Sequence, residues 1–298
     1  MIHTPPIQTD RSLSTLCTFG IGGPARYFIE VTTIKEMQEA LIYAHNKGIS
    51  YIILGKGSNC LFDDRGYDGL VILNKIGFLE EKAPGVFYVG AGYSFSRLGA
   101  FTARKGWSGL EFASGIPGSV GGAVYMNAGA NSRETRETLS TVQFVTANGE
   151  IKIFERAEMT WAYRSSLFQH MSGAIVSATF ALTASEEARK KQIDFVRYRQ
   201  TTQPYSDMSA GCIFRNPPEQ SAGALIDQSG LKGLKIGGAA VSDRHANFII
   251  NAGGAKSQDV IALMQLVQQR ILAATGVSLI SEVVFVPYQG AQQGSLHG

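Results

Sequence analysis

Apolar and polar positions repeat along the chain with two periods, and together they predict a mixture of helices and strands. Thr33 and Glu36 have the spacing of a capping box, and apolar residues recur at helical spacing until Gly48, which predicts a helix over 33–48. The same pattern predicts helices at 94–105, 221–228 and 257–274, the first closed by Gly106 and the last by Gly276. Short apolar runs predict strands at 49–54, 70–73, 86–89, 173–182, 245–251 and 277–286.

Two further segments carry their own signals. Asn148-Gly149 separates the apolar runs 141–147 and 150–155, which is the strongest short-range signal of a β-hairpin. In residues 185–200, Ser185 stands at the N-cap position, acidic residues come first and basic residues follow, as the helix dipole favours. We interpret this charge run as a solvated helix face that connects to the last third of the chain.

The predicted elements group into an α+β protein of three units. The chain of 298 residues is long enough for two domains or three lobes with a sizeable core. We expect units at 1–75, 76–190 and 191–290, followed by a disordered polar tail at 291–298.

The composition is typical of a globular enzyme and excludes several other classes. A net charge of +3, dispersed along the chain, argues against binding to nucleic acid or to a membrane surface. Three widely spaced cysteines and five scattered histidines argue against a disulfide framework and against a metal site. Because the sequence shows neither a signal peptide nor an apolar run of transmembrane length, we expect a cytoplasmic protein.

Glycine-rich loops are the most informative feature of the sequence. Residues 112–129 contain five glycines: Gly115, Gly118, Gly121, Gly122 and Gly129. Because glycine has no Cβ, the backbone N–H groups of such a loop can approach a ligand closely, and the usual ligand is a phosphate. The alternative is a flexible linker, but linkers are rich in serine and charge, whereas this segment carries Ile116, Val120 and Met126. We favour a pyrophosphate cradle.

The familiar nucleotide-binding motifs do not explain these loops. The P-loop pattern, Gly-x-x-x-x-Gly-Lys-Ser/Thr, does not occur. Segments 20–25 and 55–60 resemble the dinucleotide fingerprint, but neither one opens a helix, as that fingerprint requires. The chain therefore has three glycine-rich loops of another kind, the second of which follows the predicted strand 49–54.

Three reactive side chains stand in apolar surroundings. Glu282 interrupts the predicted strand 277–286, where a buried carboxylate needs a partner or a raised pKa; a solvent-exposed glutamate at a strand end is the simpler alternative. Arg164 suits the capture of a carboxylate or phosphate, but its spacing does not separate this from a surface salt bridge. Cys212 lies between glycine and aliphatic residues, where a lone cysteine is most often packing.

Taken together, the motifs of the chain resemble one family of flavoenzymes, the UDP-N-acetylenolpyruvoylglucosamine reductases. The resemblance covers nearly the whole chain, from Thr18 to Phe285. It rests on motifs in the family's order: GKGSN at 55–59, GIPGSVGGA at 115–123, NAGA at 127–130, YRSS at 163–166, GCIFRNP at 211–217, and LKG at 231–233 with IGGA at 236–239.

The resemblance implies a fold and an activity. The fold is α+β, with a two-lobed FAD-binding domain of the vanillyl-alcohol-oxidase (PCMH) type and a C-terminal α+β substrate-binding domain. The cofactor is non-covalent FAD and the co-substrate is NADPH. Hydride would pass from flavin N5 to UDP-N-acetylglucosamine enolpyruvate, giving UDP-N-acetylmuramate for peptidoglycan synthesis. No obligate protein partner is implied.

The resemblance also assigns three catalytic residues. Arg164 and Glu282 would stabilise the enolate that forms as hydride adds, and Cys212 occupies the position of the proton donor. This position is a departure, because the best-known members have serine there. A thiol, with a reference pKa of about 8.5, releases a proton more readily than an alcohol. Since a thiolate cannot donate, we expect an alkaline limit to activity.

Binding residues follow from the same motifs. FAD would contact Gly55, Lys56, Gly57, Ser58, Asn59, Gly115, Ile116, Pro117, Gly118, Ser119, Gly121, Gly122, Ala123, Asn127 and Gly129. The substrate would contact Tyr163, Arg215, Asn216, Lys232 and His245. The chain lacks the insertion that carries a substrate-covering tyrosine in the longer class of the family, so we assign it to the shorter class.

Two alternatives stay open at this point. An FAD-dependent oxidase of the same fold, acting on another alcohol or sugar, would need a different C-terminal domain. A non-enzymatic nucleotide-binding protein would need only the glycine loops. Flavin absorbance separates the second alternative from both enzymes, and NADPH oxidation that depends on the enolpyruvyl nucleotide separates the two enzymes.

Overall fold

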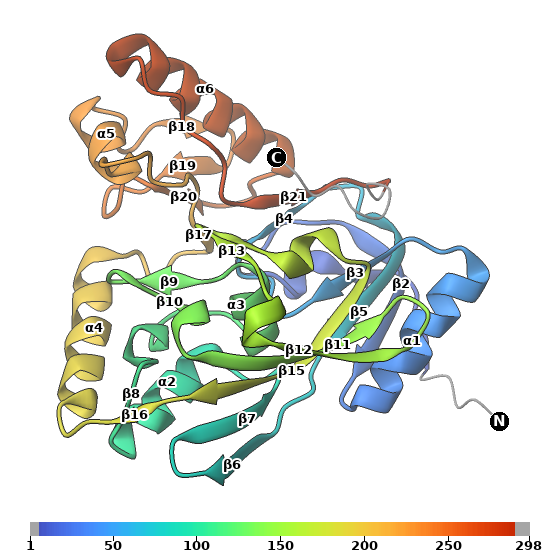
Figure 1. The fold of residues 1–298 in the computed structure, drawn as a ribbon. Helices are drawn as coiled ribbons and strands as arrows, with labels where there is room; N and C mark the ends of the chain where they lie inside the picture. Colours follow the sequence, from blue (N-terminus) through green and yellow to red (C-terminus); the bar gives the residue numbers. More distant parts are fainter. Residues whose placement is uncertain (1–5, 290–298) are drawn as a thin grey trace.

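The computed structural model describes residues 6–289 and contains three larger sheets, as Figure 1 shows. Their strand orders are β1-β2-β5-β3, β12-β11-β15-β7-β6 and β17-β20-β19-β18. The three sheets follow one another along the chain, which confirms the α+β class. The tail predicted at 291–298 lies outside the described residues.

The first sheet is mixed and is covered by one helix. It contains β1 (Arg11–Ser12), β2 (Pro24–Val31), β3 (Tyr51–Leu54) and β5 (Tyr67–Asn74), with β2 and β3 parallel to β5 on either side. The helix α1 (Ile34–Lys47) buries Met37 and Leu41 against it. The predicted capping box is present, because Thr33 Oγ1 accepts from the Glu36 N–H at 3.1 Å and Glu36 accepts from the Thr33 N–H at 3.2 Å.

The second sheet is antiparallel. It consists of β6 (Leu79–Ala83), β7 (Val86–Gly90), β11 (Leu139–Thr146), β12 (Ile151–Glu155) and β15 (Gly173–Ala181). The predicted hairpin is confirmed, since Val145 pairs with Ile151 across the Asn148-Gly149 turn. This unit also carries the helices α2 (Phe95–Arg104), α3 (Val120–Tyr125) and α4 (Ala188–Thr202).

The helix α4 packs against α2 (Figure 1). The prediction that Ser185 caps this helix is wrong. The Ser185 N–H donates to the Gly106 carbonyl at 2.7 Å, and the helix begins only at Ala188. This bond holds the preceding chain in an extended course, so Glu187 takes the N-cap position. The domain boundary at residues 190 and 191 stays a prediction.

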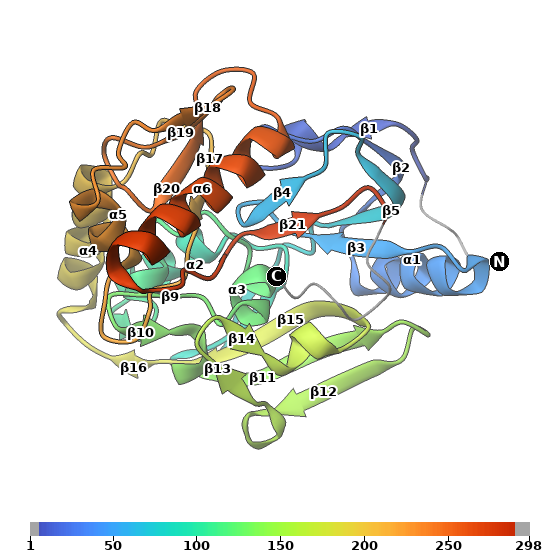
Figure 2. The same ribbon diagram turned by 90° about the horizontal axis from the view of Figure 1, so that it is seen from above.

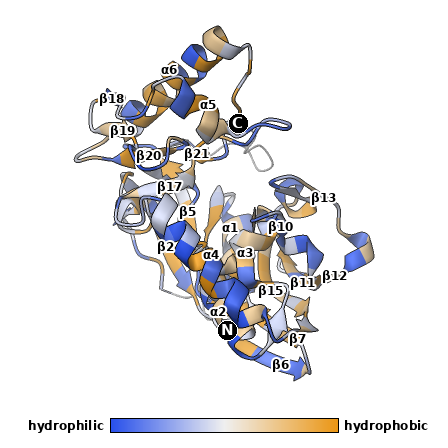
Figure 3. Cartoon of the chain, turned by 90° about the vertical axis from the view of Figure 1, so that its left-hand side faces the viewer, coloured by the Kyte–Doolittle hydropathy of each residue, from blue (hydrophilic) through white to orange (hydrophobic). Residues whose placement is uncertain are grey.

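The third sheet carries the C-terminal helix. It is formed by β17 (Ser209–Cys212), β18 (Lys235–Ile236), β19 (Ala239–Val241) and β20 (Phe248–Asn251), with α5 (Ala222–Gln228) beside it. The helix α6 (Ser257–Thr275) buries Val260, Leu263, Val267 and Ile271, and Gly276 ends it with a left-handed φ of 73°. Figure 3 shows the expected alternation of hydrophobic and hydrophilic residues around α6.

After α6 the chain returns to the first unit. The prediction of one strand over 277–286 is wrong, because only β21 (Val284–Val286) is a strand, and it pairs in parallel with β4 (Cys60–Phe62) (Figure 2). The strand starts late because the backbone before it bonds elsewhere: the Glu282 N–H donates to the Ile213 carbonyl at 2.7 Å. The β4–β21 pair therefore brings Glu282 next to the second glycine loop.

Short two-residue strands complete the structure. They are β8 (Trp107–Ser108), β9 (Gly129–Ala130), β10 (Arg133–Glu134), β13 (Trp161–Ala162), β14 (Ser165–Ser166) and β16 (Thr183–Ala184). The β13–β14 hairpin matters most for the site, because its turn contains Tyr163 and Arg164.

Candidate active site

An ion pair between residues far apart in the sequence forms the centre of the site. Arg164 Nε donates to Glu282 Oε1 at 2.6 Å, and the two side chains are only 17% and 14% exposed. The simpler alternatives for both residues, a surface salt bridge and an exposed glutamate, are thereby excluded. A buried charged pair needs good geometry to offset its desolvation, and this pair has further partners on both sides.

The backbone of Arg164 is held in a strained conformation. Its φ of 57° lies in the left-handed region, which a residue with a long side chain rarely adopts. The side chain is fixed by a second bond from Nη2 to the Gly129 carbonyl at 3.1 Å, and its guanidinium lies 4.9 Å from the centroid of the Tyr163 ring. Strain of this kind persists where the surroundings over-determine a functional residue.

Glu282 is anchored on two sides through its backbone. Besides the bond to Ile213, its carbonyl accepts from Asn59 Nδ2 at 3.2 Å. Burial raises the pKa of the Glu282 carboxyl, and the positive charges of Arg164 and Arg215 oppose that rise. The expectation of a buried carboxylate with a partner is confirmed, although the residue precedes the strand instead of interrupting it.

Cys212 lies at the end of β17, close to the ion pair. Burial raises the pKa of its thiol to about 12; the negative charge of Glu282 adds to the rise, while Arg164 and Arg199 oppose it. This raised pKa moves the expected alkaline limit, which rested on the reference pKa of a thiol, to higher pH. Up to strongly alkaline pH, Cys212 keeps the proton that a donor needs.

The backbone around Cys212 is held by Asn247, which the sequence reasoning missed. Asn247 is 3% exposed, and its side-chain amide donates to the Phe214 carbonyl at 2.8 Å and accepts from the Phe214 N–H at 3.0 Å. Its own carbonyl accepts from the Ile213 N–H at 2.8 Å. No spacing in the sequence indicates this clasp, because it joins the residues that follow β17 to the residue that precedes β20, about 30 positions later in the chain.

Three of the five predicted substrate-binding residues fall into two groups. Arg215 belongs with the ion pair, and its buried Nε has no hydrogen-bond partner within residues 6–289. Lys232 and His245 form the other group: Lys232 pairs with Asp227 at 2.7 Å, and burial followed by the charge of Lys232 lowers the pKa of His245. An orphaned guanidinium nitrogen is an open donor for an anionic ligand.

The other two predicted substrate contacts, Tyr163 and Asn216, differ in which of their groups are available to a ligand. Tyr163 is 44% exposed, and its ring stacks on the guanidinium of Arg164. Asn216 accepts from the Ala222 N–H at 3.1 Å and so helps to cap α5. Its amide N–H₂ group remains for a ligand.

Arg199 is a second residue that the sequence did not single out. Its positive charge acts on both the Cys212 thiol and the His245 imidazole, so it lies between the two groups. Arg199 Nε donates to the Tyr205 hydroxyl at 3.0 Å, which donates in turn to the Gly115 carbonyl at 2.9 Å. The residue sits in the charge run that we interpreted as a solvated face, and nothing local distinguishes it from its neighbours.

The second glycine loop, Gly55 to Asn59, has the character of an anion site. In the described structure, the backbone N–H groups of Lys56, Gly57 and Ser58 donate no hydrogen bond. Lys56 Nζ donates only to Ser94 Oγ at 2.9 Å, and partial burial, followed by the charges of Arg97 and Lys75, lowers its pKa. Free amides beside crowded positive charge fit a phosphate.

The central loop, Gly115 to Ala123, uses its amides differently. The N–H groups of Val120 and Gly121 donate to the carbonyls of Tyr93 and Ala91, at 2.9 and 2.8 Å, and the Gly122 N–H donates to Ser119 Oγ at 3.3 Å. The amides that we expected to hold pyrophosphate are thus bonded within the chain. The loop forms a wall beside the second loop, since a Cβ on Gly55 would lie 2.3 Å from Ser119 Oγ.

The remaining predicted cofactor residues surround these two loops. Ile116, Pro117 and Gly118 precede α3, and a Cβ on Gly118 would meet the side chains of Ile116 and Ser58 at 3.9 Å, an ordinary van der Waals contact, so Gly118 faces the second loop. Asn127 is fully buried, and its side chain bonds to Glu134, Ala162 and Arg136. We therefore interpret Asn127 as a residue that holds the loop, whereas Gly129 presents its carbonyl to Arg164.

These features fit FAD better than a metal. The free amides of residues 56–58, the close approach of the two glycine loops at Gly55 and Gly118, and the basic Lys56 match a diphosphate. Residues 6–289 contain no group of three His, Cys, Asp or Glu side chains that could hold a metal ion. Over the same residues, none of the helices is long and apolar enough to cross a membrane.

Comparisons with known proteins agree with this geometry. Residues 25–155 match the sequence model of an FAD binding domain, and residues 203–286 match that of the UDP-N-acetylenolpyruvoylglucosamine reductase C-terminal domain. The reductase of Protochlamydia amoebophila is 60% identical over 94% of both chains, and that of Chlamydia abortus is 48% identical over 95% of this chain and 96% of its own. The solved structure of the Thermus caldophilus reductase is 35% identical, covers 94% of this chain and 98% of its own, and has a TM-score of 0.79.

Proposed function

Because the chain belongs to the UDP-N-acetylenolpyruvoylglucosamine reductase family, we propose that the Arg164–Glu282 pair and Cys212 carry out its chemistry. The protein is an FAD-dependent oxidoreductase that reduces UDP-N-acetylglucosamine enolpyruvate to UDP-N-acetylmuramate with NADPH. The observation that carries the assignment of residues is the buried 2.6 Å ion pair beside a protonated thiol.

When bound, FAD accepts hydride from NADPH and supplies it to the enolpyruvyl group. Adding hydride to the methylene carbon places negative charge on the substrate's carboxylate and the neighbouring carbon. The guanidinium of Arg164 stabilises this developing charge, and Glu282 holds the guanidinium in place. Fixed charges aimed at the enolate lower the barrier because they need no reorganisation during the reaction.

Cys212 completes the reaction by transferring the proton from Sγ to the carbon next to the carboxylate. The thiol holds its proton because burial raises its pKa. Negative charge that stays on Sγ after transfer faces Arg164 and Arg199, which stabilise it. Asn247 keeps this part of the backbone in register.

Arg215 and Lys232 are the cations that would bind the anionic nucleotide. Arg215 offers its orphaned Nε near Glu282, and Lys232 lies with His245 on the side of α5. Tyr163 and the free amide of Asn216 add contacts at the edges of the site. This set favours a ligand with a carboxylate and phosphates.

FAD is held by the second glycine loop, with amides 56–58 at its phosphates and residues 115–123 as the opposite wall. Burial raises the pKa of Cys60, the cysteine next to the second loop, so its thiol is a poor nucleophile and we propose that the flavin is non-covalent. Within the described residues no cysteine forms a disulfide, and we propose a reducing, cytoplasmic compartment. Acid denaturation should release all of the flavin colour into solution, and colour that precipitates with the chain would contradict this point.

The experiment that tests the function is a two-step stopped-flow assay. NADPH should bleach the flavin, and UDP-N-acetylglucosamine enolpyruvate should restore its colour with release of UDP-N-acetylmuramate. An oxidase of the same fold, which the relatives do not favour, would instead be reoxidised by oxygen at the same rate with or without the nucleotide. Reoxidation that is independent of the nucleotide would overturn the proposal.

A further inference from the structure

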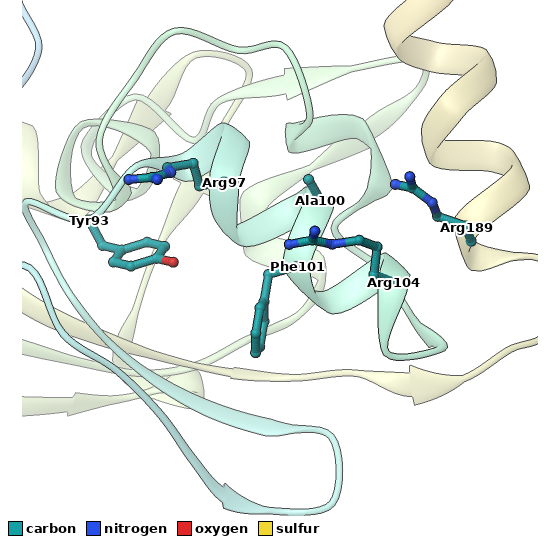
Figure 4. Close-up of a pocket in the computed structure, with 6 residues that line it drawn as sticks. All are labelled: Tyr93, Arg97, Ala100, Phe101, Arg104 and Arg189. Atoms are coloured by element: carbon teal, nitrogen blue, oxygen red, sulfur yellow. The ribbon is translucent and has the colours of Figure 1, made fainter.

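A second basic surface lies outside the site described above, between α2 and α4 (Figure 4). We name it the α2–α4 groove; it has a volume of about 380 Å³ and is lined by Tyr93, Arg97, Ala100, Phe101, Arg104 and Arg189. Three of its six lining residues are arginines, and none is acidic. Apart from the charge of Arg97 beside Lys56 and the Tyr93 carbonyl that accepts from Val120, these residues take no part in the site described above.

The helical repeat of α2 produces this arrangement. The helix buries Phe95, Leu98 and Thr102 on its inner side, so Arg97, Ala100 and Arg104 fall on one outer stripe. The small side chain of Ala100 leaves the hollow between the two arginines. Arg189 faces this stripe from the first turn of α4, because α4 packs against α2.

Within residues 6–289, no ion pair compensates the positive charge of the groove. Two acidic residues of neighbouring segments are paired with lysines, since Glu81 binds Lys105 at 2.6 Å and Glu187 binds Lys191 at 3.1 Å. Within residues 6–289, Arg97, Arg104 and Arg189 form no ion pair, and Arg189 bonds only to the neutral Gln192 at 2.5 Å. Three uncompensated guanidinium groups favour a multiply charged anion.

The three guanidinium groups lie at two places in the groove. In Figure 4 those of Arg104 and Arg189 lie near Ala100, whereas that of Arg97 extends away from Ala100, toward Tyr93. Arg97 and Arg104 are seven residues apart, which separates their backbones by about 10 Å along the helix. A single orthophosphate reaches one of these places, and a chain of phosphoryl groups reaches both.

We propose that the α2–α4 groove binds an oligophosphate, a ligand with two or more linked phosphoryl groups, at a site separate from the FAD and substrate sites. Each phosphoryl group would take a forked contact from a guanidinium, the geometry for which arginine is suited. The positive charge of Arg97 lowers the pKa of Lys56, so the basic surface continues toward the second glycine loop. A ligand in the groove therefore lies close enough to influence flavin binding.

The test uses the FAD-loaded enzyme and isothermal titration with inorganic tripolyphosphate, with orthophosphate as the comparison ligand. The parent should bind tripolyphosphate more tightly than orthophosphate. Arg104→Gln with Arg189→Gln should weaken tripolyphosphate binding about tenfold or more, and Arg97→Gln should do so independently. The control is Arg270→Gln, which removes an equally exposed charge from α6.

Four results would overturn the proposal: equal binding of both ligands, unchanged binding by the arginine variants, an equal loss in the Arg270 control, or binding of a single-stranded oligonucleotide in place of tripolyphosphate. Loss of FAD from the variants without any tripolyphosphate binding by the parent would assign the groove to the cofactor instead. Because the titration does not use the reductase reaction, its result is independent of the proposed function.

Discussion

The two sides of the candidate site are built from different parts of the chain. The cofactor side consists of glycine loops, in which three consecutive residues, 56–58, have backbone N–H groups that donate no hydrogen bond within the described structure. The chemical side consists of the side chains of Arg164, Cys212 and Glu282, which meet only because β21 pairs with β4. A binding loop can therefore be formed by residues that are neighbours in the sequence, whereas a reaction centre depends on the whole fold. Substitutions on the two sides should therefore cause separable defects.

The largest effect is expected for Cys212→Ala on the chemical side. Without the thiol proton, the second half-reaction should slow by about 10²–10⁴-fold. In stopped flow, NADPH would bleach the flavin at the parent rate, and the enolpyruvyl nucleotide would fail to restore the colour. Cys212→Ser should recover much of the activity, because the hydroxyl can also donate a proton.

The matched control is Cys17→Ala, which removes a free thiol outside the reaction centre. It should reoxidise like the parent and keep its FAD. If Cys212→Ala also reoxidises at the parent rate, Cys212 is packing and the proton comes from another group. If it loses FAD instead, the two sides of the site are not separable.

A somewhat smaller loss is expected for Glu282→Gln. The amide keeps the shape of the carboxylate but removes the charge that holds Arg164, and loss of one preorganised electrostatic contact costs about 10²–10³-fold in turnover. Flavin reduction by NADPH should persist. Glu158→Gln, in an exposed turn, serves as the control. If Glu282→Gln keeps a turnover close to that of the parent, the prediction is wrong and the ion pair has a structural role only.

On the cofactor side, Gly118→Ala should weaken FAD binding about tenfold, because a methyl group would project between the two glycine loops, where we place the flavin's phosphates. That methyl would make only ordinary contacts, at 3.9 Å, with Ile116 and Ser58, so the chain itself should not be strained. Gly77→Ala is the control. The readout is the melting temperature at two FAD concentrations, since a weaker ligand stabilises less. Unchanged FAD affinity would move the cofactor away from the central loop.

Sequence patterns predicted what is local in this protein. The capping box at Thr33, the Asn148-Gly149 hairpin and the glycine at the end of α6 are each set by a few neighbouring residues, and each is confirmed. The element boundaries near Ser185 and residue 277 were wrong, because distant backbone partners, Gly106 and Ile213, decide them. Local propensity has no information about such partners.

The same limit applies to the site. The motifs located the glycine loops and the reactive residues. Glycine content could not show, however, that the N–H groups of Val120 and Gly121 donate to backbone carbonyls, whereas those of residues 56–58 donate no hydrogen bond in the described structure. Arg199 and Asn247 were missed because their roles come from contacts with Tyr205 and Phe214. These contacts exist only in the folded chain.

The smallest expected effect is on the pH profile, and it tests the environment of Cys212 directly. An isolated thiol with a pKa of about 8.5 would lose its proton at mildly alkaline pH, so the parent would fall behind Cys212→Ser there. In this fold burial raises the pKa of Cys212 to about 12. The protonated, donating form is complete well below that pKa and is lost only as the pH rises through it. The ratio of kcat between the parent and Cys212→Ser should therefore stay constant up to about pH 10, two units below the pKa. A fall in this ratio near pH 8.5 would show that the thiol is solvated in the working enzyme, which would break the contrast between an enclosed chemical side and an open cofactor side.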